Sequence, residues 1–99
     1  MTTKQHIIFN PRFPLGYVAA TPGAVEILES EGLEAAEFLN RHASCDWGDI
    51  CDEDKRSNEA ALKYGSRLLS SYSLPAGAKL WIITEADRSV TTLLLPKEY

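Results

Sequence analysis

The last third of the chain restricts the fold more than any other part of this 99-residue sequence. Residues 67–74, 79–85 and 89–95 are three runs rich in β-branched, aromatic and other apolar side chains, which is typical of strands. Only two short, turn-rich connections separate these runs, and strands joined so closely pair in antiparallel fashion. The pattern therefore predicts a three-stranded antiparallel meander, ended by Pro96.

Three helices are predicted in the middle of the chain. Thr21, placed just before a proline, is a good helix-capping residue, and Gly32 is expected to end the first helix. Apolar side chains at helical spacing predict a second helix over residues 33–43. Asp52 is a good N-cap for a third helix over residues 53–64, and two further acidic residues in the first turn suit the helix dipole.

The first part of the chain completes the expected fold. Residues 16–20 form a short β-prone run, and two X-Pro pairs make residues 1–15 an extended or irregular N-terminal arm. We therefore expect one α+β domain over residues 1–99, with the element order β-α-α-α-β-β-β. The helices are expected to pack on one face of a small sheet that contains the meander, and the sequence leaves the place of the first strand open.

The net charge of −4 is unevenly distributed. Residues 1–60 carry five basic and eleven acidic side chains, a balance of −6, whereas residues 61–99 carry five basic and three acidic, a balance of +2. Direct nucleic-acid binding requires clustered Lys and Arg, so we do not expect it, and the acidic half leaves room for a basic protein partner.

The apolar runs are short, and the first five residues are polar. A membrane span needs about 20 consecutive apolar residues, and a secretory signal needs an apolar stretch near the N-terminus. We therefore expect a cytoplasmic protein without a membrane partner. No glycine-rich phosphate loop is present, and no cofactor is expected.

The densest polar segment, residues 44–54, is the predicted interaction surface. Its candidate binding residues are Asp46, Asp49 and Asp52, together with Trp47. Tryptophan is over-represented among interface anchors, so Trp47 is either an exposed contact or a lid over the helix junction.

Arg88 is the fifth candidate binding residue. It lies in the predicted turn between the last two strands, where the simplest expectation is an ion pair with the neighbouring Glu85 or Asp87. The alternative is a role at an interface or in binding an anion.

Patterns for metal binding and catalysis are weak. His42, Cys45 and Cys51 lie within ten residues, but a structural zinc site usually has a closer cysteine pair and a second pair elsewhere. We expect instead a surface histidine at a helix end and two free thiols. The acidic segment lacks the glycine and glutamate of an EF-hand, and Ser70 lacks the elbow motif of a serine hydrolase. No catalytic residue and no metal ligand is predicted.

Nearly the whole chain resembles a group of short bacterial proteins. The likeness is carried by residues 9–16 (FNPRFPLG), 20–24 (ATPGA), 46–49 (DWGD), 67–72 (RLLSSY) and 80–92 (LWIITEADRSVTT). On these residues the chain is similar to the uncharacterised "plasmid-related" hypothetical proteins of plasmids and integrative elements. The resemblance implies a bacterial, mobile-element context, but it does not point to any particular activity. The group's pattern often lacks Cys45, so the resemblance gives the two cysteines no joint role.

Three functions follow as hypotheses. The first is a non-enzymatic protein-interaction or regulatory module, whose contact surface is a sheet edge or residues 46–54. The second is an acidic nucleic-acid mimic that inhibits a DNA-binding enzyme, and the third is a small hydrolase that uses the acidic residues 46–54.

Overall fold

The computed structural model describes residues 11–99 and confirms the predicted element order. The predicted N-terminal arm lies outside the described residues up to residue 10, and residues 11–15 are irregular, as expected. Along the chain the elements are β1 (Tyr17–Ala20), α1 (Pro22–Glu31), α2 (Ala35–Ala43), α3 (Asp52–Tyr64), β2 (Leu68–Ser73), β3 (Lys79–Thr84), β4 (Val90–Leu94) and a short 3-10 helix, η1 (Pro96–Glu98).

The four strands form one mixed sheet in the order β1-β4-β3-β2. The antiparallel meander is confirmed, because β3 pairs with β2 on one side and with β4 on the other. The first strand, whose place the sequence left open, runs parallel to β4, with Tyr17 opposite Val90 and Ala20 opposite Leu93. A parallel pair needs a long connection, and the segment that contains all three helices supplies it.

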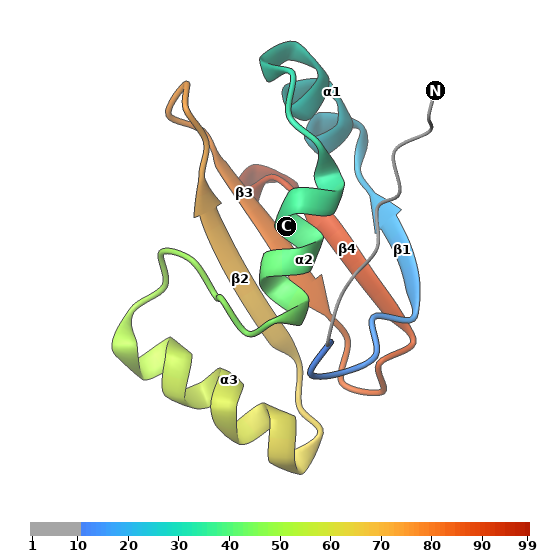
Figure 1. Ribbon diagram of the computed structural model, residues 1–99, viewed down its shortest axis with the longest axis vertical. Coiled ribbons are helices and arrows are strands. Elements are labelled where there is room, and N and C mark those ends of the chain that lie inside the picture. The colour runs from blue at the N-terminus through green and yellow to red at the C-terminus, as the bar shows by residue number, and fades with distance from the viewer. Residues whose placement is uncertain (1–10) are drawn as a thin grey trace.

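The main core lies between the helices and one face of the sheet (Figure 1). Side chains alternate along a strand, so Leu80 and Ile82 of β3 point to this face while Trp81 points away from it. Helix α2 crosses the face, and α1 lies over one end of the sheet (Figure 1). The buried members of this core are Ala24, Leu28, Phe38, Tyr72, Leu74, Leu80, Ile82 and Leu93.

A second, smaller core lies where α3 approaches the start of β2. It consists of Phe13, Trp47, Ala61 and Leu68. The irregular segment before β1 therefore contributes a buried aromatic ring, and α3 packs at the margin of the sheet, since its first turns are largely exposed.

The predicted ends of α1 are confirmed. The Thr21 hydroxyl accepts a hydrogen bond from the Ala24 N–H at 3.2 Å, and Gly32 ends the helix with φ 66°. The prediction for the start of α3 was wrong by one residue. Cys51 is the N-cap, because its carbonyl already accepts from the Lys55 N–H, and Asp52 is the first helical residue.

Candidate functional site

The predicted interaction segment closes the β2 edge of the sheet. The Ser71 N–H donates to the Trp47 carbonyl at 3.0 Å, and the Asp49 N–H donates to the Ser71 carbonyl at 2.6 Å. Gly48, between them, has φ 77°, and a Cβ there would lie 2.1 Å from the Ser71 carbonyl oxygen. This loop is therefore packed backbone to backbone against the sheet, and only glycine fits at its centre.

Trp47 is a lid on the second core. The residue is 4% exposed, and its ring packs against the rings of Phe13 and His42. The indole N–H reaches the Glu59 carboxylate on α3 at 3.1 Å, which satisfies its one polar group. Of the two placements that the sequence left open, the structure has the buried one, and Trp47 supports the loop from beneath.

Asp46 and Asp49 are both engaged within the chain. The Asp46 carboxylate accepts from the Arg41 guanidinium at 2.7 Å, a bond that lowers the pKa of Asp46. The Asp49 carboxylate accepts from the Ser73 hydroxyl at 2.5 Å and lies 3.7 Å from the Lys79 ammonium. The Ser73 bond lowers the pKa of Asp49. These two acids fasten the loop to α2 and to the sheet.

Arg88 does not form the predicted ion pair with a neighbouring carboxylate. Its guanidinium donates instead to backbone carbonyls, including Ser66 at 2.6 Å, Ala61 at 3.0 Å and Glu85 at 3.1 Å. A cation on the last carbonyls of a helix is favourable, so Arg88 ties the end of α3 to the β3–β4 turn.

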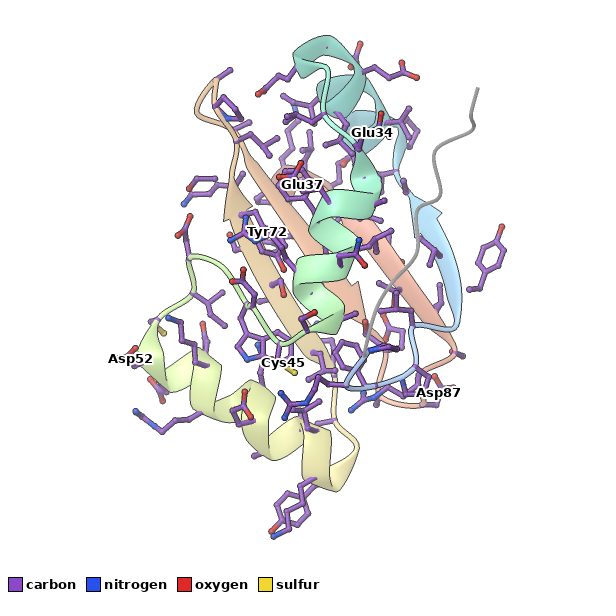
Figure 2. The ribbon with its side chains drawn as sticks, in the orientation of Figure 1. Glu34, Glu37, Cys45, Asp52, Tyr72 and Asp87 are labelled. Carbon is purple, nitrogen blue, oxygen red and sulfur yellow. The ribbon has the colours of Figure 1, made fainter. Side chains whose placement is uncertain are left out.

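The five predicted binding residues do not share one surface. Asp52 lies at the start of α3, and Asp87, which precedes Arg88, lies on the opposite side of the molecule (Figure 2). Asp46, Trp47 and Asp49 belong to the loop on the β2 edge, whereas Arg88 lies in the β3–β4 turn; Phe13 packs against both Trp47 and the Arg88 guanidinium.

The position predicted for His42 was wrong. We expected a surface histidine at a helix end, but His42 is fully buried between α2 and the sheet. Its Nδ1 lies 2.6 Å from the Ser70 hydroxyl, and its Nε2 lies 2.9 Å from the Thr84 hydroxyl. Serine and threonine at inward-facing strand positions were the signal that a polar partner lies in the core, since buried hydroxyls require hydrogen bonds.

The direction of the hydrogen bonds fixes the histidine tautomer. The Thr91 hydroxyl donates to the Leu15 carbonyl at 2.7 Å, so it accepts from the Thr84 hydroxyl, also at 2.7 Å. Thr84 must then accept from Nε2–H of His42, which leaves Nδ1 to accept from the Ser70 hydroxyl. The buried network is therefore complete with a neutral imidazole.

Burial is also the main reason why the imidazole stays neutral. Desolvation, with a smaller contribution from the positive charge of Arg88, lowers the pKa of His42 to about 4 from its ordinary value of 6.5. The Ser70–His42 contact has the atoms of a nucleophile and a base, but both residues are 0% exposed. A substrate cannot reach this pair in the folded chain, so the network serves the core.

Residues 11–99 contain no cluster of three His, Cys, Asp or Glu side chains that could hold a metal ion. Cys45 and Cys51 are free thiols, and burial raises the pKa of Cys45. None of the helices described here is long and apolar enough to cross a membrane.

The β1 edge is the open side of the sheet among the described residues. The Tyr17 N–H donates to Ser89 and the Thr21 N–H donates to Leu93, both in or beside β4. Backbone groups alternate along a strand, so the N–H and C=O groups of Val18 and Ala20 point to the outer edge. A hollow of about 330 Å³ lies beside this edge, lined by Pro11, Phe13, Pro14, Leu15, Gly16 and Val18.

The fold and this edge define a small α+β domain with a mixed, four-stranded sheet whose β1 side is open among residues 11–99. The chain matches no protein-family model, no curated protein and no solved structure. Its function therefore has to be argued from its own geometry.

Proposed function

We propose that this chain is a non-enzymatic protein-interaction module that binds an extended segment of a partner protein as an additional strand on β1. The observation that carries the proposal is the open β1 edge, which presents the backbone groups of Val18 and Ala20 among the described residues. An added strand takes its affinity from such main-chain hydrogen bonds and its specificity from pockets for alternate side chains.

The two edges of the sheet differ in their protection. The β2 edge is covered at Ser71 by the backbone of the Trp47–Asp49 loop. The four residues of β1 include no charged residue and no proline, which are two of the devices that prevent strand addition. Tyr17 is 74% exposed and Val18 is 41% exposed, so apolar side chains flank the free backbone groups.

The hollow beside β1 gives the proposal its side-chain specificity. An added strand points alternate side chains to the helix side of the sheet, where Phe13, Leu15 and Val18 line the hollow. Among residues 11–99 the lining carries no charged side chain, so the partner segment is expected to place an apolar side chain there.

The acidic segment is the weaker contact surface. Asp46 and Asp49 are held by cation or hydroxyl partners within the chain, which leaves fewer free carboxylates for a basic partner or for hydrolysis. The nucleic-acid mimic requires a continuous acidic stripe, whereas Glu37 on α2 lies well away from Asp52 on α3 (Figure 2). Neither alternative gains a specific observation in its favour, and both stay hypotheses. The mobile-element context rests on the sequence resemblance alone.

The test is partner capture from a bacterial lysate with variants that separate backbone pairing from side-chain loss. Val18→Pro removes one outward N–H and leaves the bonds between β1 and β4 intact, because proline is tolerated on an edge strand. Val18→Ala trims the same side chain but keeps the N–H. Captured proteins are compared by quantitative mass spectrometry after circular dichroism has shown that both variants are folded.

We expect a protein that wild type and Val18→Ala retain and that Val18→Pro loses. A folded Val18→Pro variant that retains the same proteins as wild type would refute strand addition. Asp49→Asn tests the acidic segment in the same experiment, and loss of capture with this variant alone would move the contact surface to the β2 edge. If no variant captures anything specifically, the interaction function itself is wrong.

A further inference from the structure

The second face of the sheet, opposite α1, α2 and α3, carries large apolar side chains. Strand alternation and register place Trp81 and Ile83 of β3 on this face, with Leu94 of β4 opposite Trp81. Within residues 11–99 all three helices contribute to the cores on the other side. Ile83 is nevertheless only 4% exposed and Leu94 only 6% exposed, although α1, α2 and α3 contribute to the cores on the other face.

The C-terminal strap, which we define as residues 96–99, that is η1 and Tyr99, lies against β3 on this face of the sheet. In Figure 1 the red turn of η1 lies behind β3, on the side of the sheet away from α2. The Tyr99 ring packs edge-on against Trp81, with 5.8 Å between the ring centroids. The Arg67 guanidinium lies over the Tyr99 ring, 5.5 Å from its centroid, and donates a hydrogen bond to the Tyr99 hydroxyl.

The strap is anchored through one carboxylate at the N-terminus of α1. Glu98 accepts three hydrogen bonds, from the Thr21 hydroxyl at 2.5 Å, from the Gly23 N–H at 3.0 Å and from the Leu95 N–H at 2.8 Å. A negative charge is favoured at this end of a helix. The bond from Thr21 is the main reason why the pKa of Glu98 lies below its usual range.

Gly23 is an independent sign that the anchor is a built feature. A Cβ at this position would lie 2.5 Å from a carboxylate oxygen of Glu98. The φ of Gly23 lies outside the left-handed region that requires glycine, and glycine within a helix costs stability relative to alanine. The absent side chain therefore makes room for the carboxylate, 75 residues away in the sequence.

We propose that the C-terminal strap is a releasable cover that closes the apolar second face of the sheet. The strap has the marks of a local unit of low stability, because η1 is a single short turn with no buried residue and Tyr99 is 69% exposed. When Glu98 leaves the α1 N-terminus, Tyr99 loses its fixed position over Trp81. Trp81, which is only half-buried in the closed state, then joins the buried Ile83 and Leu94 in one exposed apolar surface.

Hydrogen exchange on the wild-type chain is the first test. The Leu95, Glu98 and Tyr99 amides donate to the Glu98 carboxylate, the Leu95 carbonyl and the Pro96 carbonyl, respectively, so all three bonds depend on the strap being closed. We expect these amides to exchange together, about 100-fold or more faster than the amides that pair β3 with β4. Exchange of both sets at one common rate would show that the strap opens only with global unfolding, and the proposal would be overturned.

Variants then link the anchor to the exposure of Trp81. Gly23→Ala expels the Glu98 carboxylate while improving the helix, and Glu98→Ala removes the anchor directly. Losing one charge-assisted hydrogen bond is expected to raise the released population about tenfold or more. The readout is acrylamide quenching of tryptophan fluorescence, in which buried Trp47 is a constant background. Val25→Ala, an exposed site on α1, controls for helix propensity.

We expect Gly23→Ala and Glu98→Ala to increase quenching and the binding of the apolar dye anilinonaphthalene sulfonate, with Val25→Ala at the wild-type level. Tyr99→Ala leaves the α1 anchor intact and should expose Trp81 in the same way. Folded variants that all quench like wild type would overturn the proposal. Because the exchange experiment needs no variant, it decides the question even if one of these substitutions prevents folding.

Discussion

We predict that the buried His42 makes the folded chain less stable as the pH falls. The imidazole is fully buried and neutral, with both nitrogens engaged by Ser70 and Thr84. A second proton on the ring would bring a charge into the core and would oblige Ser70 to accept the bond that it now donates. The folded chain therefore resists protonation, whereas the unfolded chain accepts a proton at an ordinary histidine pKa.

The direction of the pH effect follows from the two pKa values. His42 has a pKa of about 4 in the folded chain and 6.5 as the ordinary value. Between these values the unfolded state binds more protons, so the free energy of unfolding falls as the pH falls. This contribution is absent above pH 6.5 and reaches its full size below pH 4.

The size of this loss of stability follows from the difference between the two pKa values of His42. At about 1.4 kcal/mol for each pH unit, the full loss is roughly 3 kcal/mol, and at pH 5 it is about 2 kcal/mol. Small domains have a total stability of about 5–15 kcal/mol, so the loss at pH 5 is a substantial fraction of it.

Urea unfolding at pH 7.5 and pH 5, followed by circular dichroism, measures the effect. His42→Gln carries no titrating ring, so its free energy of unfolding should fall by about 2 kcal/mol less than that of wild type between these two values. Carboxylates titrate alike in both proteins and cancel in the comparison. Equal pH dependence in the two proteins would refute the argument, as would an NMR titration of the His42 ring with an ordinary midpoint near 6.5.

Two further predictions concern the β2 edge. The Asn58 side chain donates to the Leu69 carbonyl at 2.7 Å and accepts from the Leu69 N–H at 3.1 Å, so Asn58→Ala should cost about 2–4 kcal/mol in urea unfolding. Asn58→Asp should cost at least as much, because it places a buried carboxylate oxygen against the Leu69 carbonyl in place of the amide donor. Gly48→Ala should destabilise by more than about 2 kcal/mol, because its Cβ would meet the Ser71 carbonyl. Gly32→Ala, also at positive φ but in open space, should cost only about 1 kcal/mol, and equal losses would contradict the packing argument.

The sequence predicted those parts of the fold that have a local signal. Strand periodicity and short turns indicated the meander, and the cap at Thr21 and the glycine at position 32 marked both ends of α1. These signals depend on a few adjacent residues and on hydrogen bonds close along the chain, so no knowledge of distant contacts is needed.

Only the tertiary structure decided where the polar groups lie. The charge and end-of-helix position of His42 are compatible with a surface site, and its burial depends on hydroxyls 28 and 42 residues away. The candidate binding set took its three acids from one segment, but Asp46 and Asp49 are held by Arg41 and Ser73 within the chain. A carboxylate in a loop looks the same in sequence whether it is free or engaged.

The sequence by itself determined the helices and strands and their order, because the spacing of neighbouring apolar and polar residues indicates each element. The parallel place of β1, the closed β2 edge and the bond from Gly23 to Glu98 came from the tertiary structure alone. Each of these joins segments far apart in the chain, and such contacts are selected by the packing of the whole domain rather than by local propensity.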